Sequence, residues 1–488
     1  MFPLLLTSVA LPLVFAPVVL FLSDRFGPRV GWIAAIPLSL STLAVILSGS
    51  VGNVVEMFRW EPIGYFGFRA DGLSVPIVFT VSLLCSVISI YSMPYMTHRL
   101  GKESKEYGLY FALYLLYSTG MIGAVLATNL IEFYLFFELM LIPSYFLIAR
   151  WGYGDRDKIS FMYFMWTHVG ALALLAGILT LWVVSGTFDL SVLASTVIPQ
   201  SYRSWITIMI LMGLLVKMAA FGVHIWLPHA HAEAPTPISA LLSPAMIGIG
   251  GYAIVRILMT ISPELIGAIS FQLSIWALIT MVYGALMALV QDDIKRLMAY
   301  SSISQMGYIL LGIASVQIQG VSGSMFHYLS HGMGKGILFM VAGIIITQVH
   351  GTRSISKLGG LARKMPITAT AALIGFLTIL GVPPTSGFIS EFLIFFGFIN
   401  SAMHPLILQK VIVAIGAIVS TALTAGYTLW TMKRIFFGSL PAEMAQVAEA
   451  PSTMTVPLIV LAATAIFLGI LPDTVLSGML AQISTMIK

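Results

Sequence analysis

Charged residues and cysteine are both scarce in this sequence of 488 residues. Asp, Glu, Lys and Arg make up 9% of the chain, whereas a soluble domain carries about 25%. The one cysteine, Cys85, lies in an apolar stretch, which excludes an internal disulfide, a cysteine-ligated zinc site and an iron–sulfur cluster on this chain. A small buried side chain is the better interpretation of this residue. The sequence also has no Walker A loop and no GxGxxG motif, so we expect it to bind neither a nucleotide nor a flavin.

The sequence is instead rich in apolar residues. Hydrophobic residues make up 59% of the sequence, and its mean hydropathy is +0.99. This composition indicates an integral membrane protein with many spans. The first apolar run, 2–22, has no basic n-region and no small-residue cleavage site, so we predict a retained span and not a signal peptide.

Fourteen apolar segments are long enough to cross a bilayer, because a helical span needs about 20 residues. They cover approximately 2–22, 30–51, 72–95, 107–127, 129–150, 159–184, 204–225, 237–260, 270–290, 296–317, 322–348, 366–400, 409–436 and 452–472. We therefore predict an all-α polytopic membrane protein with about 14 transmembrane helices. Between spans two and three, the alternating stretch MFRWEPIGYFGFRADG predicts a short β-hairpin outside the bilayer.

The distribution of basic residues predicts the orientation. Of the 24 Lys and Arg residues, 16 lie in loops that follow odd-numbered spans, and Lys217 and Lys335 lie inside spans. The loops and ends on the opposite side hold the other six, which are Arg59, Arg69, Arg203, Arg256, Lys410 and Lys488. Because Lys and Arg are enriched in cytoplasmic loops, we predict that both termini are extracytoplasmic.

Two spans contain helix breakers next to a charge. Span seven runs from Lys217 into HIWLPHAHAEAPTPISALLSP, and we predict a break near Pro228; span twelve contains LTILGVPPTSGFISEF, and we predict a break within 381–387. The breaks are five spans apart, which predicts two inverted repeats, helices 4–8 and 9–13, as in many transporters. The chain then divides into four regions. Residues 1–106 contain helices one to three and the hairpin, and residues 107–260 contain the first repeat. Residues 261–436 contain the second repeat, and residues 437–488 contain helix fourteen.

Four ionisable residues lie inside predicted spans: Glu138, Lys217, Lys335 and Glu391. A charge at the bilayer centre costs roughly 2.5–3.5 kcal/mol on insertion scales, so such residues usually face a protein interior or an ion pathway. If Glu138 approaches Lys217, the carboxylate controls how tightly the lysine holds its proton. The alternative is a structural ion pair between helices five and seven, although buried pairs contribute little stability. The alternative role of Glu391 is to satisfy the broken end of helix twelve.

Two histidines share a helix face with Lys335. His327, His331 and Lys335 are four residues apart in predicted helix eleven, so their side chains form one slanting polar face. Because histidine titrates near neutral pH, this face predicts a proton path. Hydrogen-bonded packing is one alternative. Metal ligation is another, which we disfavour because no HExxH pattern accompanies the pair.

Further titratable residues surround the predicted break of helix seven: His224, His229, His231 and Glu233. They either extend the proton path or cap the broken helix ends. In span six, His168 is a lone histidine that we expect to be a packing residue. Glu132 lies near a predicted helix start, where a carboxylate suits the helix dipole, so we expect a structural role for it.

Five segments around these residues resemble a known family: FYLFFELMLIPSYFLI, KMAAFGVHIWLPHAHAEAPTPISALLS, QDDIKRLMAYSSISQMGYILLGI, HGMGKGILFMVAG and GVPPTSGFISEF. The chain resembles the antiporter-like membrane subunits of respiratory complex I from about residue 70 to residue 436. The same family includes subunits of Mrp-type cation/proton antiporters and of membrane-bound hydrogenases. The acid Glu391 is similar to that of the M-type subunit, equivalent to mitochondrial subunit 4, because the L-type subunit typically has lysine there. The resemblance implies fourteen helices in two inverted repeats.

The resemblance also implies roles for the intramembrane charges. Glu138 matches the glutamate of helix five, Lys217 the lysine of helix seven, and Glu391 the last residue of the internal path. One position departs from the M-type pattern, because Gly248 stands where those subunits usually have a lysine in helix eight. Lys335 instead resembles the helix-eleven lysine of L-type and antiporter relatives. This departure suggests an archaeal or hydrogenase-like branch, such as a reduced-deazaflavin dehydrogenase complex.

The resemblance implies a proton-translocating membrane subunit of a complex I-like oxidoreductase, in the plasma membrane of a bacterium or archaeon. Flavin and iron–sulfur clusters are then expected on peripheral partner subunits, and other antiporter-like and small membrane subunits beside this chain. The alternatives are a subunit of a sodium/proton antiporter, a subunit of a membrane-bound hydrogenase, and a structural membrane scaffold. The intramembrane charges argue against the scaffold.

Overall fold

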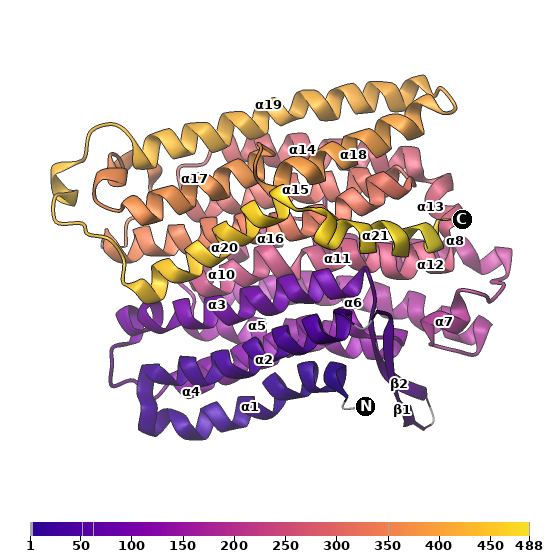
Figure 1. The fold of residues 1–488 in the computed structure, drawn as a ribbon, viewed down its shortest axis with the longest axis horizontal. Coiled ribbons are helices and arrows are strands. Elements are labelled where there is room, and N and C mark those ends of the chain that lie inside the picture. The colour runs from indigo at the N-terminus through magenta and orange to yellow at the C-terminus, as the bar shows by residue number, and fades with distance from the viewer. Residues whose placement is uncertain (1–2, 51, 62, 350, 488) are drawn as a thin grey trace.

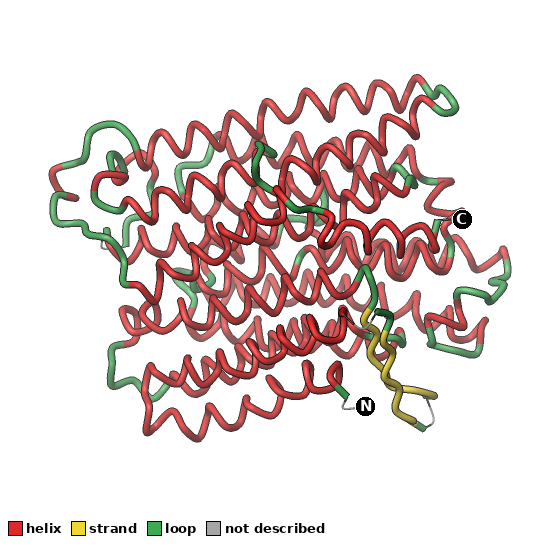
Figure 2. Tube along the Cα trace, viewed as in Figure 1, coloured by secondary structure: helices red, strands yellow, loops and turns green. Residues whose placement is uncertain are grey.

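The computed structural model describes residues 3–50, 52–61, 63–349 and 351–487, and most of these residues are helical (Figure 2). The helices pack side by side with their axes roughly along one direction (Figure 1). By length and composition, twelve helical segments of the described residues can cross a membrane, and one of them, Leu4–Ser50, contains two helices. The expected all-α polytopic architecture is confirmed, while the count of fourteen crossings and the repeats stay predictions.

The N-terminal region consists of two helices and a β-hairpin. Helices α1 (Leu4–Phe26) and α2 (Val30–Ser50) are joined by a single 3₁₀ turn. Strands β1 (Val54–Trp60) and β2 (Gly64–Ala70) pair antiparallel, which confirms the predicted hairpin. Glu132, in the first turn of the helix Leu130–Trp151, accepts a hydrogen bond at Oε2 from the backbone N–H of Gly67 (3.1 Å), so this carboxylate links that helix to β2.

The next helices are α3 (Ser74–Leu100), α4 (Tyr107–Leu126), α5 (Leu130–Trp151), α6 (Arg156–Ser185), α7 (Leu190–Leu193), α8 (Gln200–Met218) and α9 (Trp226–Glu233). Helices α8 and α9 are the halves of predicted helix seven, which is therefore broken. However, the break spans 219–225, and the predicted position near Pro228 is wrong. Pro228 lies in the first turn of α9, where a missing N–H costs no helical hydrogen bond.

Predicted helix eight is not a continuous α-helix. It consists of α10 (Thr236–Leu241), a π-helical segment (Leu242–Met246), α11 (Gly248–Ala253), a second π-helical segment (Ile254–Leu258) and α12 (Met259–Ile261). The whole segment is buried inside the bundle. π-helical turns are rare and occur frequently at functional sites, and hydrophobicity alone does not reveal them.

The second half of the bundle contains α13 (Pro263–Ala268), α14 (Ser270–Leu289), α15 (Ile294–Ala314), α16 (Ile318–Gln348), α17 (Pro366–Leu380), α18 (Ser386–Met403) and α19 (Leu408–Phe436). Helix α16 lies in the interior and is buried along nearly its whole length. Helices α17 and α18 are separated by 381–385, so the predicted break in helix twelve is confirmed.

The C-terminal region contains two helices where we predicted one. Helices α20 (Ser452–Ile470) and α21 (Asp473–Met486) are separated at Leu471, before Pro472, and together run from one end of the bundle to the other (Figure 1). Gly469 packs directly on the backbone of the helix-twelve break, since a Cβ there would lie 2.7 Å from the Ser386 nitrogen. This third break therefore touches the second.

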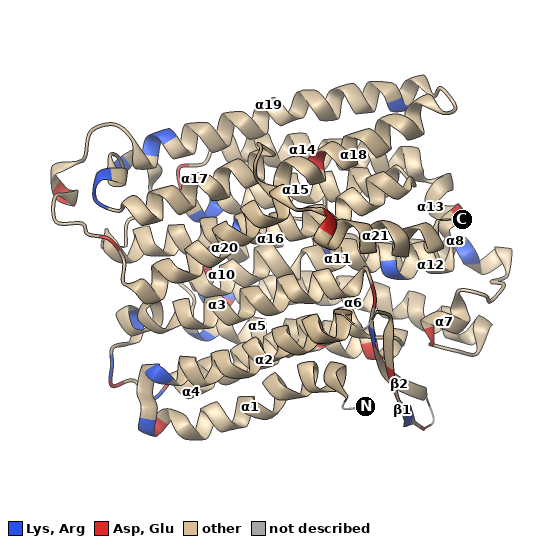
Figure 3. Cartoon of the chain, in the orientation of Figure 1, with Lys and Arg blue, Asp and Glu red and all other residues tan. Residues whose placement is uncertain are grey.

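Charged residues are distributed unevenly over the molecule. Lys and Arg residues gather mainly at the end opposite the hairpin, and far fewer lie at the other end (Figure 3). Both termini lie toward the hairpin end (Figure 1). This arrangement agrees with two termini on the same side, and their extracytoplasmic location stays a prediction.

Candidate functional site

The break between α8 and α9 begins with a residue in the left-handed conformation. Ala219 has φ 55°, and the N–H of Ala220 donates to the carbonyl of Leu215 (3.1 Å), a Schellman-type helix end. Beyond it, the indole Nε1 of Trp276 on α14 donates to the carbonyl of Phe221 (2.8 Å). Non-helical backbone at membrane depth thus finds its hydrogen-bond partners within the protein.

Lys217 lies in the last turn of α8, next to this break. Its side chain is 1% exposed, and its Nζ lies 4.6 Å from the ring centroid of Phe137 on α5. The Nζ atom has no hydrogen-bond partner among the described residues. The aromatic face and the negative end of the α8 dipole both favour the ammonium form.

Glu138 follows Phe137 on α5 but faces a different helix. Its Oε1 lies 3.4 Å from Nδ1 of His168 on α6, and the described residues form no ion pair between Glu138 and Lys217. The direct acid–lysine contact that we considered is therefore absent. His168 does stack on Phe164 (5.2 Å between ring centroids), as a packing residue should, but its contact with Glu138 was not predicted.

The histidines of helix seven have different environments. His231 on α9 is fully buried and stacks on Phe339 of α16 (4.7 Å), and neither ring nitrogen has a partner among the described residues. His224 lies in the break, where its Nδ1 accepts the backbone N–H of Gly222 (3.1 Å). His229 is only partly buried. The structure thus places His231 in the interior and fixes His224 as part of the break.

The predicted face of α16 is buried and continuous. Lys335 is 0% exposed and donates from Nζ to the carbonyl of Met298 (3.1 Å) and to the hydroxyl of Ser301, both on α15. One turn earlier, His331 is buried with both ring nitrogens unpartnered by described residues. The lysine therefore has a fixed position between two helices, and the histidine beside it is free to accept or donate a proton.

The polar face of α16 extends to the second break, which separates α17 from α18. Nδ1 of His327 lies 2.9 Å from Oγ of Ser390 on α18. The Ser390 hydroxyl also lies within hydrogen-bond distance of the carbonyl of Gly387 (2.8 Å), so it joins the imidazole of His327 to the first turn of α18. The next residue, Glu391, is 7% exposed and packs over Gly381, where a Cβ would lie 2.7 Å from its carboxyl carbon.

These contacts join α9 to α18 through α16. Along α16 the residues at four-residue intervals are Phe339, Lys335, His331 and His327. His231 stacks on Phe339 at one end of this row, and Ser390 contacts His327 at the other end, one residue before Glu391. The structure therefore brings together most of the predicted residues of the second repeat, and it separates them from Glu138.

Gly248 meets α16 at an aromatic ring. A Cβ at this position would collide with the ring of Tyr328, whose hydroxyl donates to the carbonyl of Ala245 (2.7 Å). Tyr328 is seven residues, or about 10 Å along the helix, from Lys335. A longer side chain at position 248 is therefore incompatible with Tyr328 in this position.

A buried basic cluster at the end of α9 was not predicted. Lys295 was expected in a cytoplasmic loop, but it lies in the first turn of α15, is fully buried and donates to the carbonyl of Ala234. Arg353 donates to the carbonyl of Ala232 (2.6 Å) and pairs with Asp293 (2.9 Å). The two cations thus stabilise the C-terminal carbonyls of α9. The polar segment QDDIKR resembles an exposed loop, so the sequence contained no signal of this burial.

A second unpredicted contact is a buried ion pair between Asp71, which precedes α3, and Arg256. The guanidinium donates to both carboxylate oxygens at 2.7 and 2.8 Å, and its Nε donates to Tyr252 Oη (3.0 Å). Burial alone would raise the pKa of Asp71, but the charge and hydrogen bonds of Arg256 lower it to about 2. The partners are 185 residues apart, and we had placed Arg256 among the basic residues of the outer loops.

Metal ligands are not grouped in the described part of the chain. No three His, Cys, Asp or Glu side chains there lie close enough together to hold a metal ion.

Two family models match the chain. The model described as "NADH:quinone oxidoreductase/Mrp antiporter, TM" matches residues 127–420, and that described as "NADH-Ubiquinone oxidoreductase (complex I), chain 5 N-terminus" matches residues 60–111. Subunit M of the F(420)H(2) dehydrogenase of Methanosarcina mazei is 36% identical, over 98% of this chain and 97% of its own length. The chain belongs to the family of antiporter-like subunits of complex I-like oxidoreductases.

Other relatives agree with this assignment. Subunit M of the NADH-quinone oxidoreductase of Rhodobacter capsulatus is 32% identical, over 95% of this chain and 92% of its own. The fold matches a chain of respiratory complex I from Thermus thermophilus with a TM-score of 0.88 and 26% identity, covering 99% of both chains. A chain of the Mrp complex from Dietzia sp. DQ12-45-1b has the same fold, with a TM-score of 0.86, 23% identity and full coverage of both chains. This antiporter-like subunit is a multi-pass membrane protein, and its relatives are subunits of larger assemblies.

Proposed function

We propose that this antiporter-like subunit moves protons through its interior along Lys217, the α16 face and Glu391. The supporting observation is a set of buried ionisable groups that have no hydrogen-bond partner among the described residues: Lys217 Nζ, both nitrogens of His231 and His331, His327 Nε2 and Glu391 Oε1. Buried polar groups in proteins are nearly always hydrogen bonded. Water satisfies such groups, and a chain of water molecules between titratable side chains carries protons.

Each side chain has a role that follows from its position. Lys217 holds a proton at the end of α8, and Glu138 acts on it from the other side of α5, with His168 setting the charge that the lysine senses. Lys335 holds the central proton between α15 and α16. His331 passes it toward His327, whose Nδ1 faces Ser390, and Glu391 is the last acceptor. His224, His229 and Lys295 border the cytoplasmic approach to this row.

Transport against a gradient needs an energy source outside this chain. Moving one charge across 100 mV costs about 2.3 kcal/mol, and the sequence contains no motif for a flavin, nucleotide or iron–sulfur cluster. Partner subunits that carry these cofactors therefore supply the energy, in the plasma membrane of a bacterium or archaeon. The 36% identity to an F(420)H(2) dehydrogenase subunit favours a reduced deazaflavin over NADH as the electron donor.

The test is the proton-to-electron ratio of the assembled complex in vesicles. Lys217→Met removes the buried ammonium with little change in volume and should abolish the share of pumping that depends on this subunit. Lys433→Met, at an exposed lysine in the last turn of α19, is the matched control and should pump normally. Normal pumping by Lys217→Met in a fully assembled complex would contradict the proposal.

The second candidate is a subunit of a sodium/proton antiporter, which the description of the matching family model includes. The two functions differ in their energy source. Vesicles that contain the purified assembly, with a sodium gradient and no electron donor, should show no proton movement if the first proposal is correct. Sodium-driven proton movement under these conditions would favour the antiporter.

A further inference from the structure

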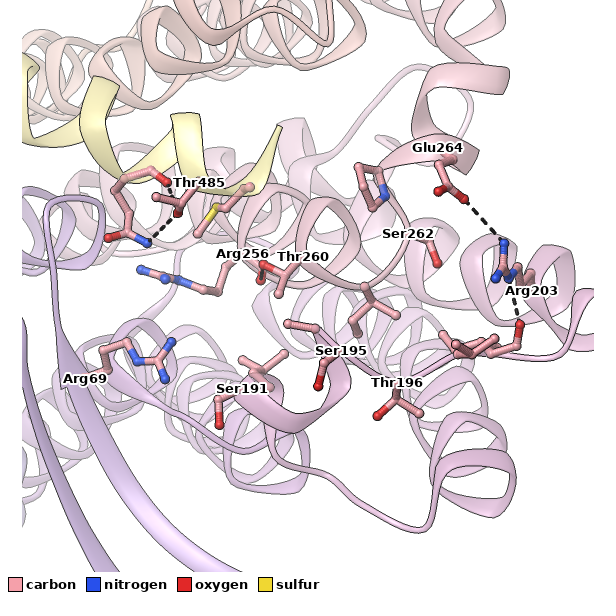
Figure 4. Close-up of a pocket in the computed structure, with 18 residues that line it drawn as sticks. Arg69, Ser191, Ser195, Thr196, Arg203, Arg256, Thr260, Ser262, Glu264 and Thr485 are labelled. Atoms are coloured by element: carbon pink, nitrogen blue, oxygen red, sulfur yellow. Dashed lines mark hydrogen bonds and ion pairs between the residues drawn. The ribbon is translucent and has the colours of Figure 1, made fainter. Parts of the chain in front are cut away.

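Two neighbouring cavities at the hairpin end of the molecule differ in their lining. The first, of about 540 Å³, lies between β2, the segment after α7, the start of α8, α12, α13 and the end of α21 (Figure 4). It is lined by the arginines Arg69, Arg203 and Arg256 and by the hydroxyls of Ser191, Ser195 and Thr260. Figure 4 shows Arg69 and Arg256 on the same side of this cavity, with Arg256 nearer to the end of α21. None of these residues belongs to the proposed proton path.

The charges of the first cavity do not balance. Arg256 is neutralised by its bidentate contact with Asp71, and Arg203 lies 3.4 Å from Glu264. Arg69 has no carboxylate within ion-pair distance among the described residues, and its side chain makes no hydrogen bond to them. The cavity therefore presents one uncompensated guanidinium, which suits a phosphate group. The hydroxyls of Ser191, Ser195 and Thr260 donate to acceptors within the protein, so their oxygens serve as acceptors for a polar head group.

The second cavity is mainly apolar. It has a volume of about 1060 Å³, and its apolar lining comes from α2, α3, α20 and α21, with Ile46, Val75, Phe79, Phe467, Leu468 and Val475. Gln482 and Thr485 line both cavities, so the polar and apolar spaces meet at α21. An apolar cavity of this size suits a hydrocarbon chain.

We propose that the two cavities together bind one anionic phospholipid. Its phosphate lies at Arg69, its head group contacts the hydroxyls of the first cavity, and its acyl chains lie in the second cavity against α3 and α20. A free phosphate shares the head-group chemistry but would leave the apolar cavity unfilled. A helix of a partner subunit would fill the apolar cavity but would place no anion at Arg69.

The experiment measures ligand retention by the full-length protein, purified in detergent and stripped of lipid, using native mass spectrometry. The protein is titrated with phosphatidylglycerol, with phosphatidylcholine as the uncharged counterpart and with glycerol phosphate as the head group alone. Arg69→Gln removes the cation, and Ala463→Trp narrows the apolar cavity that Ala463 lines. The matched controls are Arg59→Gln, at an exposed arginine of the same hairpin, and Ala422→Trp, at an exposed alanine of α19.

We expect the wild type and both controls to retain phosphatidylglycerol at a ratio near one, and phosphatidylcholine more weakly. Arg69→Gln and Ala463→Trp should each weaken phosphatidylglycerol binding by about tenfold or more, which corresponds to about 1.4 kcal/mol. Equal retention by the variants and the wild type would overturn the proposal. So would glycerol phosphate binding as tightly as the lipid and unaffected by Ala463→Trp, which would indicate a small-anion site. Cross-linking of Ala463→Cys to a partner helix in the assembled complex would show that a protein fills the cavity and would also overturn it.

Discussion

The two broken helices of the bundle end their first halves in the same way but carry opposite charges. Helix α8 ends at Ala219 with φ 55°, and α17 ends at Gly381 with φ 71°. In both, the next N–H donates to the carbonyl five residues earlier at 3.1 Å, from Ala220 to Leu215 and from Val382 to Leu377. The backbone therefore makes the same helix end twice, five predicted spans apart.

The side chains around the two ends differ. Lys217 lies two residues before the first end, where the helix dipole favours a cation. At the second end, the charge comes from α18, because Glu391 packs directly over Gly381. Gly469 of α20 closes the same region from another side. An ammonium group thus lies at the first break and a carboxyl group at the second. The second break is packed so closely that a side chain at position 381 or 469 would overlap its neighbours.

The largest expected effect on stability is that of Gly381→Ala. The new Cβ would lie 2.7 Å from the carboxyl carbon of Glu391, and an alanine with positive φ is strained. The left-handed conformation costs about 1–2 kcal/mol and the overpacking about 1–3 kcal/mol, so both thermal stability and proton pumping should fall. Gly222→Ala is the control in the first break, because its φ is +90° and a Cβ there meets nothing within 4 Å. If both variants lose stability and pumping equally, crowding of Glu391 is not the cause.

The ion pair between Asp71 and Arg256 differs from the charged groups at the two breaks, because both of its members have a partner of opposite charge. The folded pKa of Asp71 is about 2, below its ordinary value of 3.8, so the pair with Arg256 stabilises the fold fully above about pH 4. This stability, about 2 kcal/mol, is lost as the pH falls from 4 to 2. Thermal unfolding in detergent should show this loss in the wild type. Asp71→Asn should be less stable at neutral pH and lack this acid dependence, whereas Asp24→Asn at the exposed end of α1 should behave as the wild type.

A smaller effect on proton pumping is expected when Glu138 loses its histidine partner. His168→Gln removes a partly exposed partner of Glu138, and such pairs contribute about 0.2–1 kcal/mol. Pumping should fall less than about fivefold. In a Glu138→Gln background the same change should have no further effect, since the histidine acts through the carboxylate. His98→Gln, at an exposed histidine of α3, is the control. Additive losses in the double variant would show that His168 acts separately.

The smallest effect should be a gain in stability. Ala219→Gly relieves about 1–2 kcal/mol of left-handed strain, offset by about 0.5–1 kcal/mol of glycine flexibility in the unfolded chain. A net gain of about 0.5 kcal/mol should raise the unfolding temperature slightly and make the first helix end equivalent to the second. Ala220→Gly next to it should instead lower the unfolding temperature. A loss in Ala219→Gly would show that the alanine methyl contributes packing that exceeds the strain.

Hydrophobic length and helix breakers predicted most of the fold. The hairpin, the spans around α3 to α6 and the break before α18 lie where the sequence indicated, because apolar runs and consecutive prolines act locally. The break near Pro228 was misplaced, since a proline is tolerated in the first turn of a helix and a left-handed alanine leaves no sequence signal. The π-helical segments in 242–258 were missed because apolar composition does not distinguish π-helical from α-helical turns. Predicted span fourteen (452–472) matches α20, but α21 after it was not predicted.

The candidate site was predicted in part. The four-residue spacing of His327, His331 and Lys335 follows from helix periodicity, and burial of Glu391 follows from its apolar neighbours. The partners of these residues do not follow from either. Ser390 joins His327 across two helices, His168 in place of Lys217 faces Glu138, and Lys295 is buried although its neighbours are polar.

The amino-acid sequence alone is sufficient to identify this chain as a helical membrane protein with ionisable residues at membrane depth, because the lipid environment selects apolar residues wherever function does not require polar ones. Which charged residues contact one another depends on the three-dimensional packing of the helices. Contacts such as Asp71 with Arg256 join helices far apart in the chain, and their geometry depends on how helix surfaces pack, which no local pattern of residues encodes.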